Sequence, residues 1–492
     1  MQTTGLCITV IGRDEDTIRQ ARIAAEPDAD LVELRLDSME KPDAAAALQG
    51  RRKPAIVTCR PLREGGMFDG SEEARLRILA EAHAHGAEFI DVEWDANASS
   101  LIEARHGRGV IVSRHDFDGV PRDVETILNA LRAAGGEVTK LAAIVERESD
   151  LQTLLDHARP DGSSVLIGMG RAGLATRVLA ARFGSRWTYA GNGIAPGQVS
   201  AGRLIEEFKF RRIRPDGAVY ALLGRPVVNS LSPAMHNAGF AALGLNAVYV
   251  PIESRDLEGF REFAGAIGMA GASVTIPFKR DILPLLDEVA PTAAAAGAVN
   301  TIAIRDGRWI GMNTDAEGFM EPLRKRLPRL SGIRALVLGA GGAARGVGLA
   351  LRGEGAHVAI AARRSEAAQV VAQAIGGDVS SWPPRPGSWD LLVNATPVGS
   401  AEQRDAVPFN GPFDGRLVYD LVYDPDPTEL MRLATRHGCP AIGGLEMLVA
   451  QAERQFEIWT GAPPPAGLFA EAAARAIKSR SVASQLPPVG GA

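Results

Sequence analysis

The sequence of 492 residues is short of cysteine, of long apolar runs and of excess charge. Its three cysteines, Cys7, Cys59 and Cys439, lie far apart without a C-x-x-C spacing. This pattern excludes a disulfide framework, makes a structural metal site unexpected and favours a reducing cytoplasm. A net charge of −5 predicts no attraction to nucleic acid or to anionic membranes. No apolar run reaches about 18 residues, so no membrane span is expected, and the N-terminus lacks the pattern of a signal peptide.

The first 200 residues alternate short apolar runs with amphipathic segments. Eight apolar runs can be counted, and helical stretches such as SEEARLRILAEAHAHG (71–86) lie between most of them. Strands separated by helices indicate crossover connections and a parallel sheet. Eight such units predict a closed (β/α)8 TIM barrel over residues 1–212, and an open doubly wound sheet is the alternative.

A basic segment that contains proline and glycine, KFRRIRPDG (209–217), ends this pattern. Further strand and helix patterns follow, and they restart once. The changes predict an α/β domain at 218–325, another at 326–444, helices at 445–480 and a flexible tail at 481–492. A chain of this length is expected to hold about two to four domains.

The segment ALVLGAGGAARG (335–346) reads as an apolar strand, a glycine turn and the start of a helix. Gly339, Gly341 and Ala344 have the spacing G-x-G-x-x-A of a dinucleotide-binding turn, where backbone N–H groups approach a pyrophosphate. The spacing alone is a weak signal, and a glycine-rich turn without a ligand is the alternative. The residues expected at the cofactor are Gly339, Ala340, Gly341, Gly342 and Ala343.

Two arginines, Arg363 and Arg364, follow the next strand-like run, where an NAD site usually has an acidic residue. Two guanidinium groups suit a 2′-phosphate, so the pattern favours NADP over NAD. Solvated surface arginines are the alternative interpretation.

Five motifs around this turn occur in an order that resembles shikimate dehydrogenase over residues 218–480. They are NSLSPAMHN (229–237), SVTIPFK (273–279), GAVNT (297–301), GMNTDA (311–316) and GLEMLVAQ (444–451). The resemblance implies a substrate-binding domain at 218–325, completed by the helices at 445–480, and an NADP-binding Rossmann domain at 326–444.

The resemblance also implies the roles of individual residues. Lys279 and Asp315 match the family's catalytic pair, and Ser230 and Ser232 match its carboxylate-binding serines. Without the resemblance, Lys279 would be read as a solvated lysine. Further substrate contacts are expected from Thr275, Asn300, Tyr423 and Gln451, and contacts on the nicotinamide side from Leu421 and Gly444. Ser273 departs from the family, where many members have Asn.

In the first 200 residues, polar side chains gather at the carboxyl ends of the predicted strands, where barrel enzymes keep their sites. They are Glu33, Arg35, Arg60, His115, Arg177 and Gln198. Arginines that converge on one mouth of a barrel predict an anionic substrate.

Lys140 lies early in the apolar run VTKLAAIV (138–145). Burial disfavours an ammonium, and a neutral amine is a nucleophile that forms a Schiff base with a ketone. The apolar neighbours are expected to keep the amine unprotonated, and His115 is expected to move protons near neutral pH. From the strand alone, a lysine that snorkels toward solvent is the favoured interpretation.

Six motifs change that interpretation, because in order they resemble type I 3-dehydroquinate dehydratase over residues 5 to 210. They are ELRLD (33–37), TCRPLREGG (58–66), IDVE (90–93), SRHDF (113–117), TKLA (139–142) and APGQ (195–198). The resemblance implies that Lys140 forms the Schiff base and that His115 is the general acid and base.

The same resemblance implies that Glu64 and Asp91 are acidic residues of the site, with Asp91 orienting the histidine or stabilising the pocket. Substrate contacts are implied for Thr9, Glu33, Arg35, Arg60, Arg177 and Gln198. Ile194 departs from the family, which has Ser or Thr before APGQ, and an isoleucine side chain donates no hydrogen bond.

The two resemblances imply consecutive reactions, the dehydration of 3-dehydroquinate and the NADPH-dependent reduction of 3-dehydroshikimate to shikimate, with no metal. One alternative is a non-catalytic sensor of quinate or shikimate, and another is an NAD-dependent quinate/shikimate dehydrogenase fused to a dehydratase. Small-molecule substrates are the expected partners, without nucleic acid or membrane, and an oligomer is compatible with the sequence.

Overall fold

The computed structural model describes residues 4–483, which divide into two compact units. Within the described residues, the first unit comprises 4–277 and 479–483, and the second comprises 278–478. No helix among the described residues is long and apolar enough to cross a membrane. The predicted tail at 481–492 begins inside a helix that runs to Ala483, and its other residues lie outside the described part.

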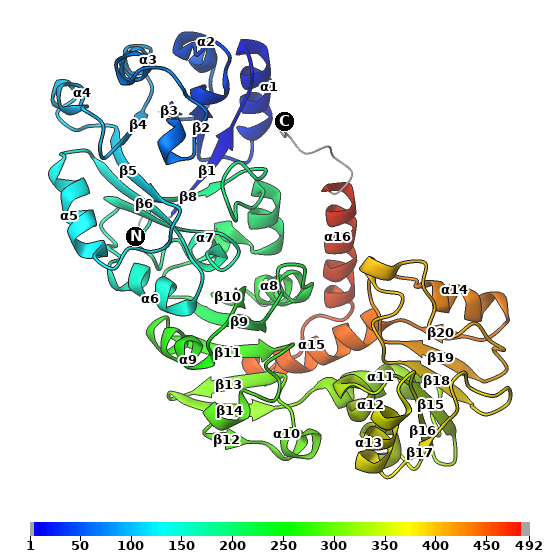
Figure 1. Ribbon diagram of the computed structural model, residues 1–492. Helices are drawn as coiled ribbons and strands as arrows, with labels where there is room; N and C mark the ends of the chain where they lie inside the picture. The colour runs from blue at the N-terminus through cyan, green and yellow to red at the C-terminus, as the bar shows by residue number, and fades with distance from the viewer. Residues whose placement is uncertain (1–3, 484–492) are drawn as a thin grey trace. The chain divides into compact units, whose positions relative to one another are not determined.

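Eight parallel strands form the first sheet, in the order β7-β6-β5-β4-β3-β2-β1-β8. An isolated bridge between Ser164 and Ser185, beside β7 and β8, brings the two ends of this order together. The sheet is therefore a nearly closed barrel, as the sequence predicts, and not an open doubly wound sheet (Figure 1). Its strands are β1 (Gly5–Val10), β2 (Leu31–Arg35), β3 (Ala55–Thr58), β4 (Phe89–Glu93), β5 (Val110–Asp116), β6 (Val138–Ile144), β7 (Ser164–Met169) and β8 (Trp187–Ala190).

Helices surround these strands, and their starts follow the sequence. Asp14, Asp43 and Ser71 cap the first three helices by accepting a backbone N–H with their side-chain oxygens. The helices are α1 (Glu15–Ala25), α2 (Ala44–Leu48), α3 (Glu72–Ala84), α4 (Ser99–Ala104), α5 (Val124–Ala133), α6 (Glu148–Asp156) and α7 (Leu174–Val178). Short turns of 3-10 helix follow two strands: η1 (Leu36–Ser38) follows β2, and η2 (Leu62–Glu64) follows β3. The segment after the barrel contains a π-helix, η3 (Arg203–Glu207), and a 3-10 helix, η4 (Phe210–Arg212).

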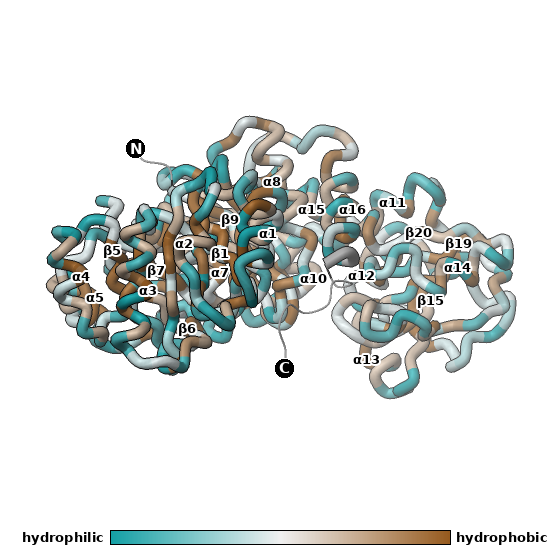
Figure 2. The backbone as a smooth tube through the Cα atoms, turned by 90° about the horizontal axis from the view of Figure 1, so that it is seen from above, coloured by the Kyte–Doolittle hydropathy of each residue, from teal (hydrophilic) through white to brown (hydrophobic). Residues whose placement is uncertain are grey.

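The barrel interior explains why the functional residues sit where they do. Side chains two residues apart on a strand share one face. Lys140 therefore shares its face with Val138 and Ala142, which pack in one cluster with Cys7 and Ile111. In Figure 2 hydrophobic residues follow the barrel strands, whereas hydrophilic residues dominate outer helices such as α1.

The rest of the first unit is a parallel arrangement of β10-β9-β11 with two helices. Arg182 ties it to the barrel side, because its guanidinium donates to the carbonyl oxygen of Ile267 at 2.6 Å and to that of Gly217. The elements are β9 (Ala218–Gly224), α8 (Ser232–Ala242), β10 (Ala247–Glu253), α9 (Leu257–Ala266) and β11 (Met269–Val274).

The second unit begins with a short strand, a helix and an antiparallel pair of strands, and it continues into a doubly wound parallel sheet in the order β17-β16-β15-β18-β19-β20. This is the predicted Rossmann arrangement. The first elements are η5 (Leu283–Leu285), β12 (Glu288–Val289), α10 (Pro291–Ala296), β13 (Thr301–Arg305), β14 (Arg308–Met312) and α11 (Asp315–Arg326). The Rossmann strands and helices are β15 (Arg334–Leu338), α12 (Gly342–Gly353), β16 (His357–Ala361), α13 (Ser365–Ile375), β17 (Asp378–Val379), β18 (Leu391–Asn394), η6 (Ala401–Gln403), β19 (Leu417–Asp420), α14 (Glu429–Arg436) and β20 (Ala441–Ile442). Two longer helices follow, α15 (Gly444–Thr460) and α16 (Leu468–Ala483). The last residues of α16, from Ser479 on, belong to the first unit.

Candidate active sites

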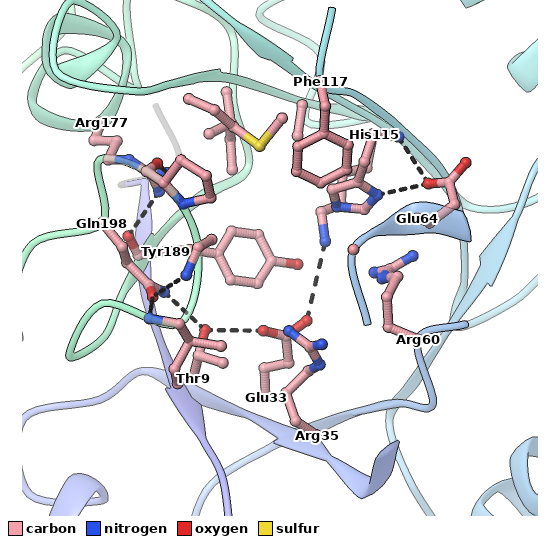
Figure 3. A pocket seen from close by; sticks show the side chains of 18 residues that line it. Thr9, Glu33, Arg35, Arg60, Glu64, His115, Phe117, Arg177, Tyr189 and Gln198 are labelled. Atoms are coloured by element: carbon pink, nitrogen blue, oxygen red, sulfur yellow. Dashed lines mark hydrogen bonds and ion pairs between the residues drawn. The ribbon is translucent and has the colours of Figure 1, made fainter. Parts of the chain in front are cut away.

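A pocket opens at the carboxyl ends of the barrel strands, and the structure brings the predicted barrel residues together there. Figure 3 shows that side chains from different strands converge on one space. The predicted residues in its wall are Thr9, Glu33, Arg35, Arg60, Glu64, His115, Lys140, Arg177, Ile194 and Gln198.

Lys140 is only 4% exposed, so it does not snorkel toward solvent. Its ammonium nitrogen Nζ lies 2.9 Å from Oδ2 of Asp91 and 4.0 Å from Oε1 of Glu33. It also lies 4.5 Å from the ring centroid of Tyr189. Two carboxylates therefore face this amine, in addition to the apolar neighbours that the sequence predicts.

His115 is held by Glu64 from two sides. The backbone N–H of His115 donates to Oε2 of Glu64 at 2.8 Å, and the ring nitrogen Nδ1 lies 2.9 Å from the same oxygen. Burial, with the nearby positive charges of Arg60 and Lys140, holds the pKa of His115 well below its usual value. The ring is therefore neutral near pH 7, and a proton on Nδ1 shared with Glu64 leaves Nε2 as the basic atom.

Glu64 is itself unusual, since burial raises the pKa of its carboxyl to about 7. The sequence prediction gave Asp91 the orientation of the histidine as one of two roles, and the hydrogen bonds place Glu64 in that role instead. Asp91 contacts Lys140, Arg60 and Ser113. Its other predicted role, stabilising the pocket, agrees with these contacts.

The three pocket arginines differ in their partners. Arg35 makes a bidentate pair with Asp37, with distances of 2.9 and 2.7 Å, and Arg60 pairs with Asp91 at 2.9 Å. Arg177 is 2% exposed, and within residues 4–483 it donates only to carbonyl oxygens, those of Tyr189 at 3.2 Å and Pro196 at 3.5 Å. Burial lowers the pKa of its guanidinium to about 10. A buried cation that faces a pocket without a carboxylate partner is suited to an anionic substrate group.

A chain of hydrogen bonds links Gln198, Thr9 and Glu33 in the wall of the pocket. Gln198 Nε2 donates to Oγ1 of Thr9 at 3.1 Å, and Thr9 Oγ1 donates to Oε2 of Glu33 at 2.8 Å. Thr58 donates to the other Glu33 oxygen at 3.0 Å. The backbone N–H of Ile194 donates to Oε1 of Gln198 at 3.2 Å, so this backbone orients Gln198 even though the Ile194 side chain is apolar.

In the second unit, Lys279 and Asp315 form an ion pair with 2.5 Å between Nζ and Oδ2. Asn300 Nδ2 donates to Oδ1 of the same carboxylate at 2.8 Å and to Oγ1 of Thr314 at 3.0 Å, and it lies 3.5 Å from Oε1 of Gln451. Lys279 and Asn300 thus contact the Asp315 carboxylate at the start of α11, and Gln451 lies beside Asn300.

Three other predicted substrate residues of the reductase, Ser230, Ser232 and Thr275, lie in the first unit. Ser232 begins α8, and its backbone N–H donates to Oγ of Ser230 at 3.2 Å. Thr275 follows β11, where its N–H donates to the carbonyl oxygen of Leu223 at 2.9 Å. Ser273, the departure from the family, is 5% exposed near the end of β11.

The glycine turn after β15 fits the phosphates of a dinucleotide. Gly339 has a φ of +113°, a conformation that favours glycine. Gly341 and Gly342 are exposed, open space lies where a Cβ would stand, and α12 begins at Gly342. The backbone N–H groups at the N-terminus of a helix can donate hydrogen bonds to a phosphate. Ala340 and Ala343 belong to the same turn.

The remaining predicted cofactor residues lie at two further places in this unit. Arg363 and Arg364 are exposed directly after β16. Leu421 follows β19, as does Tyr423, a predicted substrate residue, and a Cβ on Gly444 would stand 2.2 Å from the Leu421 carbonyl oxygen. Only glycine allows that close approach of α15 to the loop.

Several site residues escaped the sequence prediction. Tyr189 and Phe117 line the barrel pocket, and Glu93 accepts a hydrogen bond from the pocket residue Arg60. Strand alternation could have found Glu93, because it is two residues from Asp91 and shares its face.

The fold and these sites define a two-part enzyme, a barrel with a buried lysine joined to a dinucleotide-dependent reductase. Residues 6–215 match the family described as Type I 3-dehydroquinase, 222–302 the shikimate dehydrogenase substrate binding domain, and 444–474 the shikimate 5′-dehydrogenase C-terminal domain. The chain is 34% identical over 486 residues to a bifunctional 3-dehydroquinate dehydratase/shikimate dehydrogenase, chloroplastic, of Arabidopsis thaliana, which covers 91% of this chain and 80% of the relative. The chain belongs to this bifunctional family.

Two further relatives cover the second half. A shikimate dehydrogenase (NADP+) of Geobacter sp. (strain M21) is 43% identical over 274 residues, which is 52% of this chain and 94% of the relative. A crystal structure of a shikimate dehydrogenase in complex with NADP+ has a TM-score of 0.51 and 35% identity, and covers 54% of this chain and 96% of that chain.

Proposed function

We propose that the barrel converts 3-dehydroquinate to 3-dehydroshikimate and that the second half reduces this product to shikimate with NADPH. The observation that carries the proposal is the barrel pocket, where the buried Lys140, the neutral His115 and Arg177, which bonds only carbonyl oxygens within the described residues, face one space. An amine, a base and an anion-binding cation are what a Schiff-base dehydration of a keto acid requires.

In the dehydration, Lys140 gives up its ammonium proton, and its Nζ then attacks the ketone carbon of the substrate. Loss of the carbonyl oxygen as water leaves an iminium that acidifies the neighbouring C–H bond. Nε2 of His115 removes that proton and returns it to the departing hydroxyl, which leaves as water. Hydrolysis of the iminium releases the product and restores the amine.

The surrounding residues hold the substrate during these steps. Arg177 is assigned to the substrate carboxylate, because it is the pocket arginine without an acidic partner. Thr9, Glu33 and Gln198 form a polar wall that suits hydroxyl groups. Arg35 and Arg60 are also substrate contacts, but each already has a carboxylate partner.

In the reduction, NADPH would be held by the turn from Gly339 to Ala343, by Arg363 and Arg364 at its 2′-phosphate, and by Leu421 and Gly444 near the nicotinamide. When bound, it supplies the hydride. Lys279 donates the proton that the carbonyl oxygen needs, and Asp315 orients the ammonium through their 2.5 Å contact. Asn300, Gln451, Tyr423, Ser230, Ser232 and Thr275 are assigned to the substrate.

The proposal assigns residues 1–212 to the dehydratase, 218–325 with helices 445–480 to the substrate domain, and 326–444 to the NADP domain. The three free cysteines are all buried, which suits a reducing cytoplasm.

Borohydride treatment in the presence of 3-dehydroquinate, followed by peptide mass analysis, tests the barrel. A stable adduct on Lys140 is expected, and Lys279 serves as the matched lysine that should remain unmodified. A reductase-active protein without an adduct on Lys140 would contradict the dehydratase and indicate a degraded or repurposed barrel. Faster reduction of 3-dehydroshikimate with NADH than with NADPH would contradict the cofactor assignment.

A further inference from the structure

A ladder of paired, buried charges begins in the barrel pocket and ends in two residues that do not line it, Glu93 and Arg75. Its members are Lys140, Asp91, Arg60, Glu93 and Arg75. Glu93 is the last residue of β4 and is 1% exposed, and Arg75 lies on α3 and is 0% exposed. Burying such charges costs free energy unless each is paired. Each of these two residues therefore depends on its charged partner.

Arg60 is the centre of the ladder. One guanidinium nitrogen, Nη2, donates to Oδ2 of Asp91 at 2.9 Å, and the other, Nη1, donates to Oε1 of Glu93 at 2.7 Å. Nη1 also donates to Oγ of Ser113 at 2.9 Å. Ser113 in turn donates to Oδ1 of Asp91 at 2.5 Å. The side chain of Arg60 is thus fixed between two carboxylates.

Arg75 continues the ladder away from the pocket. Its Nη1 pairs with Oε2 of Glu93 and lies 3.3 Å from the carbonyl oxygen of Cys59, the residue before Arg60. Its Nε donates to Glu72 at 3.0 Å. Glu72 lies 3.5 Å from Arg63, which belongs to η2, the same turn as Glu64. The ladder therefore runs from Lys140 to the turn that holds His115.

We propose that Glu93 and Arg75 are positioning residues of the dehydratase, which hold Arg60 so that Asp91 faces Lys140 and η2 faces His115. The inference rests on the proposed function. Neither residue lines the pocket, so each acts only through its neighbours.

The balance of charge gives the physical reason. Asp91 accepts from both Lys140 and Arg60 through the same oxygen, Oδ2. Without the Glu93 carboxylate, Asp91 is the one ion-pair partner left to Arg60 within the described residues, and Arg60 competes with Lys140 for it. The guanidinium groups of Arg60 and Arg75, which both pair with Glu93, would then have no anion between them, and Arg60 is expected to move.

Glu93→Gln tests this inference, with Glu93→Asp as the conservative variant. Glu26→Gln is the matched control, because Glu26 is a buried carboxylate of the same barrel, 5% exposed and 3.6 Å from the buried Arg22, remote from the pocket. We expect Glu93→Gln to lower the dehydratase kcat at least tenfold, and Glu93→Asp to restore most of it.

The pH profile separates positioning from a purely structural role. In Glu93→Gln the acid limb of kcat/KM should move to lower pH. The variant lacks the Glu93 carboxylate that offsets the positive charge of Arg60, so this charge lowers the pKa of His115 further. Glu26→Gln should leave kcat and the profile unchanged. Unchanged kcat and an unchanged profile in Glu93→Gln would overturn the inference, whatever its melting temperature. Reductase activity of the same samples shows that the chain is folded, and absence of dehydratase activity in the wild type would instead refute the proposed function.

Discussion

Replacing Glu64 by Gln should make the barrel more stable at alkaline pH. Glu64 is 7% exposed, and burial raises the pKa of its carboxyl from 4.5 to about 7. Between these values the folded protein holds a proton that the unfolded chain releases, so the wild type loses stability as the pH rises through this window. The full difference of about 2.5 pKa corresponds to about 3 kcal/mol.

The variant carries no ionisable group at this position, yet its amide oxygen can still accept from the backbone N–H of His115. In the wild type, the raised pKa of Glu64 lowers the free energy of unfolding by about 1 kcal/mol at pH 5 and by about 3 kcal/mol at pH 8. The stability gap between Glu64→Gln and the wild type should therefore widen by about 2 kcal/mol from pH 5 to pH 8.

Urea unfolding with a brief pulse of thiol reagent measures this gap for the barrel alone. Cys7 and Cys59 are buried in the barrel, whereas Cys439 is buried in the Rossmann part, and peptide mass analysis distinguishes them. A gap that stays constant or narrows with pH would refute the raised pKa of Glu64. Labelling of Cys439 should show the same midpoint in both proteins at each pH.

Three further outcomes are expected. Asp315→Asn should lower the reductase kcat about 10²- to 10⁴-fold by removing the carboxylate that orients Lys279, and assays of both activities in one sample should show an unchanged dehydratase. Replacing Arg363 and Arg364 together by Ala should raise the KM for NADPH at least tenfold but leave the KM for NADH unchanged, and equal losses with both cofactors would refute the 2′-phosphate assignment. Ile194→Ser adds a hydroxyl to the pocket wall, and one hydrogen bond worth about 1 kcal/mol should lower the KM for 3-dehydroquinate roughly fivefold; an unchanged or higher KM would show that this position does not contact the substrate.

Much of the fold could be predicted because its signals are local. The eight apolar runs became the eight barrel strands, and the glycine turn before α12 lies between a strand and a helix. These features depend on the alternation of side chains and on turn chemistry within a few residues. The division of the chain near residue 277 is different, because it depends on which elements pack together and no local pattern marks it.

The barrel site could be predicted as a set of residues but not as a set of contacts. The carboxyl ends of the strands placed His115 and Arg60 in one mouth. The sequence did not reveal that Glu64 rather than Asp91 would reach His115, since Glu64 lies in the turn η2 and Asp91 on β4, and their contacts depend on how these elements pack. Arg75 lies on a helix outside the strands, and no sequence spacing links it to Glu93.

The contacts of Lys140 also change the explanation of its chemistry. An amine kept neutral by apolar walls would have to create a buried positive charge when it forms an iminium, at a high cost in desolvation. Asp91 and Glu33 instead lie 2.9 and 4.0 Å from the amine nitrogen. In the proposed dehydration, the positive charge of the iminium therefore forms beside carboxylates that are already in place, and they offset its desolvation. The neutral His115 is the base of the pocket that can take up a proton in these steps.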